Sequence, residues 1–247
     1  MKKVVVECET TQSMLVSQGV PRDSIHVIKP EIASEWAQFD FSDSLRNKIR
    51  RSLHLKSNDY VIGFFGSPQP LRGLDTLIKS IPLALKENSA IKLLILSRQR
   101  EGVLQKEYKK IERLIHKLDG EKWVRLVKGF LPRHQLIRKV ASCDLIALPF
   151  EIVPSDVPLS VLETVAIKVP LLTTRVACLP ELVPEHAGLI VKPGKAEILA
   201  SAILDMAHKH RELGDQPRVG ENDPSEDSRD GMSRPPWIKL IESVRNI

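Results

Sequence analysis

A glycine-flanked loop that carries one arginine is the first part of the sequence suited to binding chemistry. The loop runs from Gly66 to Gly73 as GSPQPLRG, after an apolar run and before a helical pattern. Gly66 lets a ligand approach the backbone, and Arg72 places a guanidinium at the start of the helix. Amide donors, the positive end of a helix and an arginine together suit an anion such as a phosphate. The alternative is an ordinary turn with a solvent-exposed arginine.

A second loop follows the apolar run CDLIALPF at residues 143–150. Ser155 or Asp156 can cap the next helix, and Pro158 fits its first turn. The backbone amides around Val157–Leu159 are therefore expected to point outward from the sheet, where they can contact a ligand.

Glu163 lies further along the same predicted helix, flanked by apolar residues. A carboxylate in such surroundings is costly unless a polar group pairs with it. Sugar or ribose hydroxyls would provide that pairing. A half-exposed glutamate near Lys168 is the alternative.

Several other chemistries are excluded by their missing motifs. The loop after Gly66 matches neither the dinucleotide fingerprint GxGxxG nor the phosphate-binding loop GxxxxGK[ST]. Cys8, Cys143 and Cys178 form neither a Cys-x-x-Cys pair nor a zinc spacing, which indicates three ordinary thiols in a reducing compartment. None of the seven histidines lies in a catalytic motif, so no catalytic residue and no metal ligand is assigned.

The elements that must position these loops form a regular alternation. Strand-like apolar runs alternate with amphipathic helices, which indicates an α/β fold with a doubly wound, Rossmann-like parallel sheet. The predicted strands are 60–65, 91–96, 124–127, 143–148, 170–174 and 188–191, and the predicted helices are 73–87, 103–118, 133–141, 157–167 and 195–210. Gly66, Ser97, Gly129 and Phe150 should all lie at the carboxyl edge of this sheet.

The two ends of the chain differ from this body. A strand at Val4–Cys8, a helix around Thr11–Gln18 and a strand at Ile25–Ile28 come first. A basic helix at Asp43–Leu55 then carries four cations, expected on a solvated face: Arg46, Lys48, Arg50 and Arg51. Residues 212–235 are predicted to be a polar linker, and residues 236–247 a terminal helix that docks through Trp237.

Charge and composition limit the classes of partner that the protein can have. The formal net charge is +6, although residues 220–231 carry five acidic residues and one Arg, so the rest of the chain is strongly basic. Three Trp, two Tyr and six Phe give few rings for base stacking, which argues against nucleic-acid binding. No apolar run approaches the length of a membrane span. We therefore expect a cytoplasmic protein, with peripheral contact at the inner face of the membrane as a further expectation.

Taken in order, the motifs resemble the C-terminal, donor-binding half of the group 1 glycosyltransferases of the GT-B fold. The resemblance covers roughly residues 3–210, and the terminal helix also fits. Its motifs are FFGSPQPLRGLDTLIKSIP, IKLLILSR, VKGFLPRHQLIRKVASCDLIALPF, SDVPLSVLETVAIKVPLLTT, LPELV and GLIVKPG.

Carried over by position, the resemblance implies a phosphate-gripping cation at Arg72, before Gly73. The partner arginine that the family places after Gly66 is replaced by Ser67. Arg98, in the loop after the second strand, is a further cation that can reach the ligand.

The family's pair of carboxylates, eight residues apart, is only half present. Glu163 matches the second and is implied to hold ribose hydroxyls, whereas the first falls at Ser155. Asp156 is one residue out of register and would contact the sugar only if the loop shifted. The amides of Val157–Leu159, next to Pro158, correspond to those that contact diphosphate or sugar.

The function that the resemblance implies is a retaining, metal-independent transferase that uses a UDP-, GDP- or ADP-linked sugar and needs no cofactor. Residues 35–211 would be the nucleotide-sugar-binding domain, and residues 1–34 a remnant of, or junction with, an N-terminal acceptor domain. An acceptor-binding subunit is then an expected partner. The alternative is a non-catalytic nucleotide-sugar-binding or interaction module, favoured by Ser67 and by the missing half.

Overall fold

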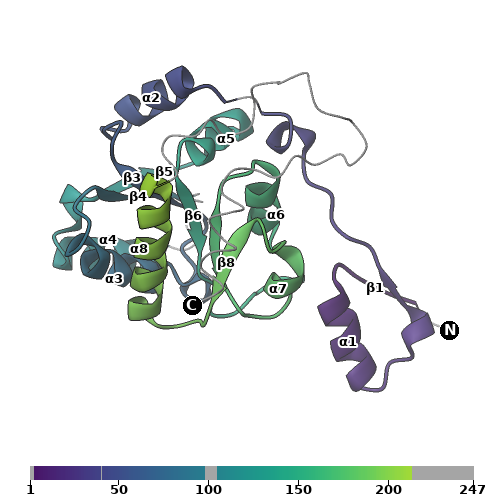
Figure 1. Cartoon of the computed structure of the whole chain (residues 1–247). Helices are drawn as coiled ribbons and strands as arrows, with labels where there is room; N and C mark the ends of the chain where they lie inside the picture. Colours follow the sequence, from purple (N-terminus) through teal and green to yellow (C-terminus); the bar gives the residue numbers. More distant parts are fainter. Residues whose placement is uncertain (1–2, 40, 98–104, 213–247) are drawn as a thin grey trace.

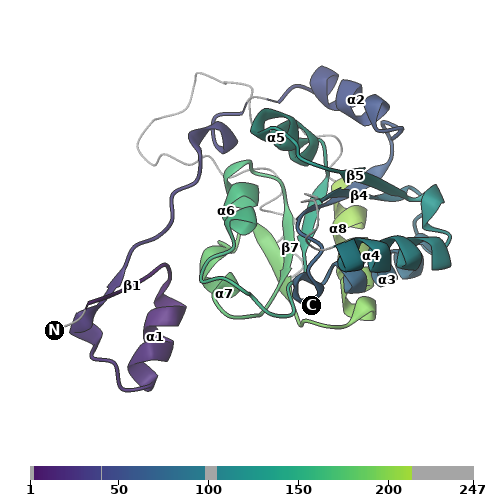
Figure 2. The ribbon, with the colours of Figure 1, turned by 180° about the vertical axis from the view of Figure 1, so that it is seen from behind.

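The computed structural model describes residues 3–39, 41–97 and 105–212. Its main body is built on a six-stranded sheet in the order β5-β4-β3-β6-β7-β8, in which every neighbouring pair is parallel. The strands are β3 (Tyr60–Gly66), β4 (Ile91–Ser97), β5 (Val124–Lys128), β6 (Leu145–Leu148), β7 (Leu171–Thr174) and β8 (Gly188–Val191). Helices cover both faces (Figures 1 and 2). The predicted doubly wound parallel sheet is confirmed.

The strand order reverses between β3 and β6. The chain winds outward from β3 through β4 to β5, and then returns to β6 and continues through β7 to β8. Because both faces of the sheet are covered, the central strands are mostly apolar, and six of the seven residues of β3 are buried. In such sheets the crevice at the carboxyl ends of the two strands that flank the reversal is the usual place for a ligand.

The register aligns the carboxyl ends of the central strands. Gly66 of β3 lies opposite Ser97 of β4, and Ser97 lies opposite Lys128 of β5. Gly129 directly follows β5, and Phe150 lies two residues after the end of β6. The predicted alignment of Gly66, Ser97, Gly129 and Phe150 at one edge is therefore confirmed.

The helices around this sheet pack in three sets. Helix α3 packs against α4 and α8, whereas α2 packs against α5, and α6 against α7. Their bounds are α2 (Asp43–Ser52), α3 (Leu74–Leu85), α4 (Gln105–Lys117), α5 (Arg133–Ala141), α6 (Leu159–Ala166), α7 (Leu179–Leu182) and α8 (Ala196–Glu212). Only α7, a single turn with a proline, has no counterpart among the predicted helices. The predicted linker and terminal helix lie outside the described residues.

A small unit at the N-terminus projects from the main body (Figure 1). It consists of β1 (Val4–Val6), α1 (Glu9–Ser17) and β2 (Ile25–Val27), and β1 pairs with β2 in parallel. An extended stretch of chain connects it to α2 (Figure 2). The assignment of residues 1–34 to a junction with an acceptor domain stays a prediction.

The expectation that the four cations of α2 lie on a solvated face is wrong for two of them. Lys48 and Arg51 are exposed, but Arg46 and Arg50 are buried beside Asp144. Arg50 Nη2 lies 2.6 Å from Asp144 Oδ2, and Arg46 pairs with the other carboxylate oxygen. Asp144 lies buried just before β6 and needs compensating charge there, which fixes α2 against the sheet.

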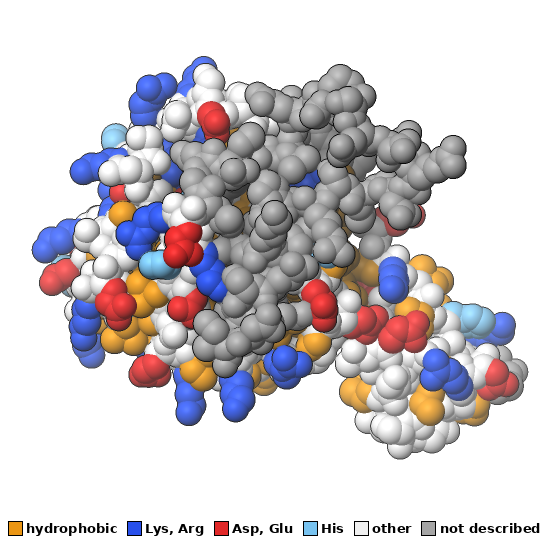
Figure 3. Space-filling view, viewed as in Figure 1, with side chains coloured by type: hydrophobic (Ala, Val, Ile, Leu, Met, Phe, Trp, Pro, Cys, Tyr) orange, Lys and Arg blue, Asp and Glu red, His pale blue; other side chains and the backbone are white. Residues whose placement is uncertain are grey.

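The charged side chains of the surface are mixed in sign. On the face shown in Figure 3, Lys and Arg side chains are interspersed with Asp and Glu. Surface pairs include Lys79 with Asp75, Lys128 with Glu112 and Arg133 with Glu35. Such exposed pairs contribute little to stability.

Gly73→Ala is expected to destabilise the protein by about 1–3 kcal/mol. Gly73 has a φ of +69°, and a Cβ there would lie 1.9 Å from the carbonyl oxygen of Pro149. The control is Gly194→Ala, because Gly194 also has a positive φ, of +80°, but open space around it. Urea denaturation should show the larger loss for Gly73→Ala; equal losses would mean that the close approach of the two loops carries no energy.

Candidate functional site

Arg72 lies at the carboxyl edge of the sheet, between the two strands at the reversal. Its guanidinium carbon lies 5.5 Å from the centre of the Phe150 ring. A Cβ on Gly66 would lie 2.4 Å from Arg72 Nη1, so the glycine makes room for the guanidinium. The φ of Gly66, +134°, also favours glycine.

The guanidinium of Arg72 lacks a compensating anion. Among the described residues it makes no hydrogen bond or ion pair, and its Nε is buried without a partner. Burial lowers the pKa of Arg72, because losing water disfavours the charged form. A half-buried cation with unused donors at a strand–helix junction is suited to bind an anion.

The loops that follow β3 and β6 are joined into one unit. The carbonyl oxygen of Leu71 accepts from the amides of Glu151, at 2.9 Å, and Ile152, at 3.1 Å. The Thr76 hydroxyl donates to Glu151 Oε1 at 2.6 Å. These bonds hold the turn that carries Arg72 against the loop that leads to α6. Ser67, partly buried after Gly66, contributes a hydroxyl where the resemblance leads us to expect a cation.

Glu163 lies at the same edge, in the second turn of α6, and is half-buried. Burial raises the pKa of Glu163, and the charge of Arg133 and a hydrogen bond from Trp36 offset part of this shift. The Trp36 ring stacks on Phe65, the residue before Gly66, with ring centres 5.8 Å apart. The two predicted site residues Arg72 and Glu163 therefore share one edge, as the sequence led us to expect.

Sequence reasoning missed Trp36 and Arg133. Both lie far from Glu163 along the chain, and nothing in their local sequence indicates a site. Arg133 also pairs with Glu35, at 2.9 Å, so it ties the turn before α2 to the start of α5. Trp36 and Arg133 thus both act on the half-buried Glu163 carboxylate at the carboxyl edge.

The N-terminal unit forms hydrogen bonds to the third group of predicted residues, which lies in the loop before α6. Asp156 Oδ2 accepts from the Glu7 amide at 2.5 Å, and Oδ1 accepts from the hydroxyl of Thr11 and, at 3.2 Å, from the thiol of Cys8. Burial alone would raise the pKa of Asp156, but these hydrogen bonds outweigh burial and lower it. Both carboxylate oxygens of Asp156 are therefore in use.

The neighbours of Asp156 differ in exposure. Ser155 is exposed, Val157 and Pro158 are buried, and Leu159 is 48% exposed at the start of α6. The Val157 amide donates to Glu7 Oε2 at 3.2 Å.

Arg98 lies outside the described residues. The residue before it, Ser97, donates to the Gly66 carbonyl oxygen at 3.1 Å and lies 2.9 Å from the Tyr108 hydroxyl. Burial raises the pKa of that hydroxyl, and the Ser97 bond offsets part of the shift. These contacts fix the end of β4 beside the end of β3.

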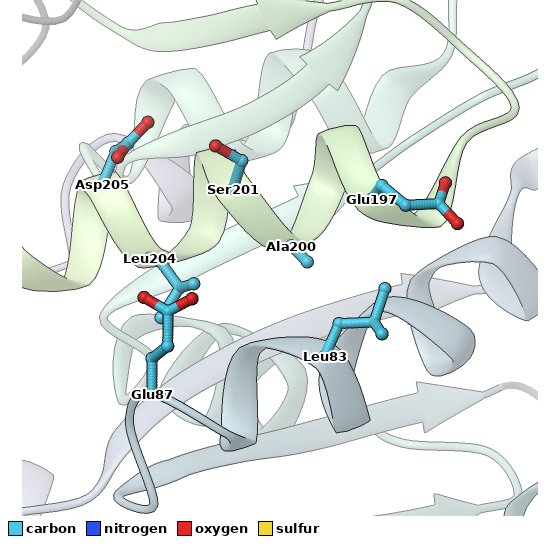
Figure 4. A pocket seen from close by; sticks show the side chains of 7 residues that line it. All are labelled: Leu83, Glu87, Glu197, Ala200, Ser201, Leu204 and Asp205. Atoms are coloured by element: carbon cyan, nitrogen blue, oxygen red, sulfur yellow. The ribbon is translucent and has the colours of Figure 1, made fainter.

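Two cavities of more than 300 Å³ lie away from Arg72. One of about 360 Å³ is lined by residues of α3, of the turn after it and of α8 (Figure 4), and the carboxylates of Glu87, Glu197 and Asp205 make it unsuited to a diphosphate. Another of about 330 Å³ lies at the amino end of β3, near the buried Asp144.

The described residues also bear on metal binding and on membrane crossing. Across the described ranges, no three His, Cys, Asp or Glu side chains come together as metal ligands would. Within the same ranges, no helix has the length and apolar character that crossing a membrane requires.

Fold and site together define an α/β domain that places a half-buried arginine without an anionic partner, among the described residues, at the reversal of a doubly wound sheet. The family model "Glycosyl transferases group 1" matches residues 46–222. The chain therefore belongs to the group 1 glycosyltransferase family.

Known structures and one curated relative extend this result. Alr3699/HepE of Anabaena, solved in complex with UDP, aligns with a TM-score of 0.72 and 21% identity, over 85% of this chain and 55% of that one. The sucrose-phosphate synthase of Thermosynechococcus elongatus gives 0.69 and 20%, over 83% and 49%. TuaC of Bacillus subtilis (strain 168), whose name describes a teichuronic acid biosynthesis glycosyltransferase, is 33% identical over 84 residues, which is 34% of this chain and 21% of TuaC. The chain thus spans about half the length of HepE and of the sucrose-phosphate synthase, which share the GT-B fold.

Proposed function

We propose that this chain is the donor-binding half of a retaining, metal-independent glycosyltransferase that takes its sugar from a nucleotide-sugar. The observation that carries the proposal is Arg72, a half-buried guanidinium without an anionic partner at the reversal between β3 and β6. The family and the complex of HepE with UDP support a nucleotide as the anion.

The proposed division of labour follows from the positions of the side chains. Arg72 and the nearby amides would neutralise the diphosphate as it leaves, and this positive charge takes the part that a divalent cation plays in other transferases. Glu163, beside Trp36, would accept hydrogen bonds from the ribose hydroxyls. None of the three cysteines forms a disulfide, so we place the reaction in the cytoplasm.

The acceptor half is proposed to come from outside residues 35–211, either as a further part of the same protein or as a separate subunit. A specific observation favours the second candidate, a non-catalytic nucleotide-sugar-binding module. Ser67 and Ser155 supply hydroxyls where the resemblance leads us to expect an arginine and a carboxylate. Such a module would bind a nucleotide-sugar without cleaving it, so no nucleoside diphosphate would be formed.

Calorimetric titration with UDP, GDP and ADP tests the donor site, and release of nucleoside diphosphate from a panel of nucleotide-sugars tests transfer. The enzyme is expected to bind one nucleotide and, with an acceptor half present, to release it from the matching donor. Binding without release would support the module, and no binding of any nucleotide would contradict both.

Nucleotide binding is expected to weaken as the pH falls from about 7.5 to about 5, because burial raises the pKa of Glu163. The ionised carboxylate accepts hydrogen bonds, so its contribution is present above this pKa and is lost as the pH falls through it. Glu163→Gln should bind more weakly at about pH 7.5 and lose less affinity on acidification. Because the nucleotide's own phosphate also titrates, the difference between the two proteins is the measurement. If the affinities of the wild type and Glu163→Gln fell equally with pH, this role for Glu163 would be contradicted.

A further inference from the structure

The N-terminal unit and the loop before α6 are joined by two reciprocal hydrogen bonds, in each of which a carboxylate of one segment accepts from a backbone amide of the other. Asp156, at the loop, accepts from the backbone amide of Glu7, at 2.5 Å, just before α1. In return, the carboxylate of Glu7 accepts from the amide of Val157, at 3.2 Å, just before α6. Each segment therefore supplies a carboxylate to a backbone amide of the other, two residues before the helix that follows. This exchange holds the Glu7 side chain at the rim of the carboxyl edge.

A second carboxylate fixes the same unit from the other side. Glu181 Oε1 accepts from the Glu9 amide at 3.0 Å, and its Oε2 accepts from the amide of Thr10 at 3.0 Å and from its hydroxyl at 2.9 Å. Burial alone would raise the pKa of Glu181, but these bonds outweigh it and lower the pKa. Helix α1 is thus anchored through its first amides, and the position of Glu7 is well determined.

Of the carboxylates that meet at this rim, Glu7 retains acceptor capacity for a ligand. Both oxygens of Asp156 accept from the N-terminal unit, as do both oxygens of Glu181. Glu7 is half-exposed, its Oε2 has the single bond from Val157, and its Oε1 has no partner among the described residues. A carboxylate fixed by one oxygen and open at the other is suited to accept from a hydroxyl.

The path of the loop indicates which hydroxyls these are. The loop begins at Phe150, which contacts Arg72, and ends at Val157, which contacts Glu7. With a diphosphate on Arg72, a group attached to its far end can extend along this loop toward the exposed Ser155 and Glu7. In a nucleotide-sugar that group is the sugar, whose surface consists of hydroxyls.

We propose that Glu7 is a specificity-determining residue that accepts hydrogen bonds from the sugar of the donor, with Asp156 as its positioning residue. This inference rests on the proposed function, because it takes the diphosphate to lie at Arg72. It assigns the sugar contact to the N-terminal unit, which the sequence offered only as a junction.

The test compares two affinities for each protein, one for UDP and one for the UDP-sugar that the wild type binds most tightly among UDP-glucose, UDP-galactose and UDP-N-acetylglucosamine. Glu7→Gln keeps an oxygen for the Val157 amide but removes the charge. It should weaken UDP-sugar binding about tenfold and leave UDP binding unchanged within about twofold. The matched control is Glu9→Gln, which removes the same charge two residues away, where the side chain is exposed, and should change neither affinity.

Asp156→Asn should reproduce the loss for the UDP-sugar, because it weakens the bond that places Glu7. If Glu7→Gln kept the wild-type ratio of the two affinities, this inference alone would be overturned. Tighter UDP binding by Glu7→Gln would also overturn it, because that result would mean that Glu7 competes with the diphosphate for the Val157 amide. A wild type that binds none of UDP, GDP or ADP would overturn the proposed function and this inference with it.

Discussion

Asp144→Ala is expected to destabilise the protein by about 3–5 kcal/mol, the cost of removing one partner of a buried ion pair. Asp144 is 2% exposed and lies between Arg46 and Arg50. Its Oδ2 also accepts from the Val61 amide, at 2.7 Å, at the second residue of β3. Alanine would leave two buried guanidinium groups without the anion beside them and a strand amide without its acceptor.

Urea denaturation of the full chain measures this loss as a lower midpoint at a similar slope. A domain of this kind has a free energy of unfolding of about 5–15 kcal/mol in total, so this loss would be a large part of it. The matched control is Asp75→Ala, which removes a carboxylate from a surface pair with Lys79 and should cost less than about 1 kcal/mol. Equal midpoints for wild type and Asp144→Ala would show that the buried charges do not hold α2 to the sheet.

The same cluster shows where prediction from sequence stops. The sheet could be predicted because each strand is an apolar run of its own, and all six runs recur as parallel strands. The burial of Arg46 and Arg50 could not, because it depends on Asp144, nearly a hundred residues later. Helical periodicity places both arginines on one face of α2 but does not say that a buried acid lies opposite.

For the candidate site the division is similar. Gly66, Arg72 and Glu163 can be predicted because they lie at the end of β3 or in the segments that follow β3 and β6, and parallel topology brings such segments together. Trp36, Arg133 and Glu7 were missed because they reach the edge through the connecting chain, α5 and the N-terminal unit. Local sequence determines which loops form the edge, whereas the side chains added from outside it depend on tertiary packing.

Arg72→Ala is expected to weaken nucleoside-diphosphate binding roughly 10- to 100-fold. Charge-assisted bonds from a guanidinium to a diphosphate contribute about 1.5–3 kcal/mol, and about 1.4 kcal/mol corresponds to tenfold. Folding should change little, because Arg72 has no hydrogen-bond or ion-pair partner in the described part of the chain. Calorimetric titration with UDP, GDP and ADP, alongside urea denaturation, separates the two effects.

Two further variants locate the parts of the nucleotide. Glu163→Ala should weaken nucleotide binding but spare free pyrophosphate, since its proposed contact is the ribose. Ser67→Arg adds the cation that the resemblance places after Gly66, and should tighten binding or leave it unchanged. Unaltered affinity for all three nucleotides in Arg72→Ala would remove the diphosphate from this edge.

The structure of the chain with UDP bound tests the central claim most directly, because it shows where the nucleotide lies. We predict the diphosphate in contact with the guanidinium of Arg72, beside Gly66 and Phe150, and the ribose hydroxyls on Glu163. A nucleotide bound at the cavity between α3 and α8, at the amino end of β3, or anywhere else away from Arg72 would contradict the account.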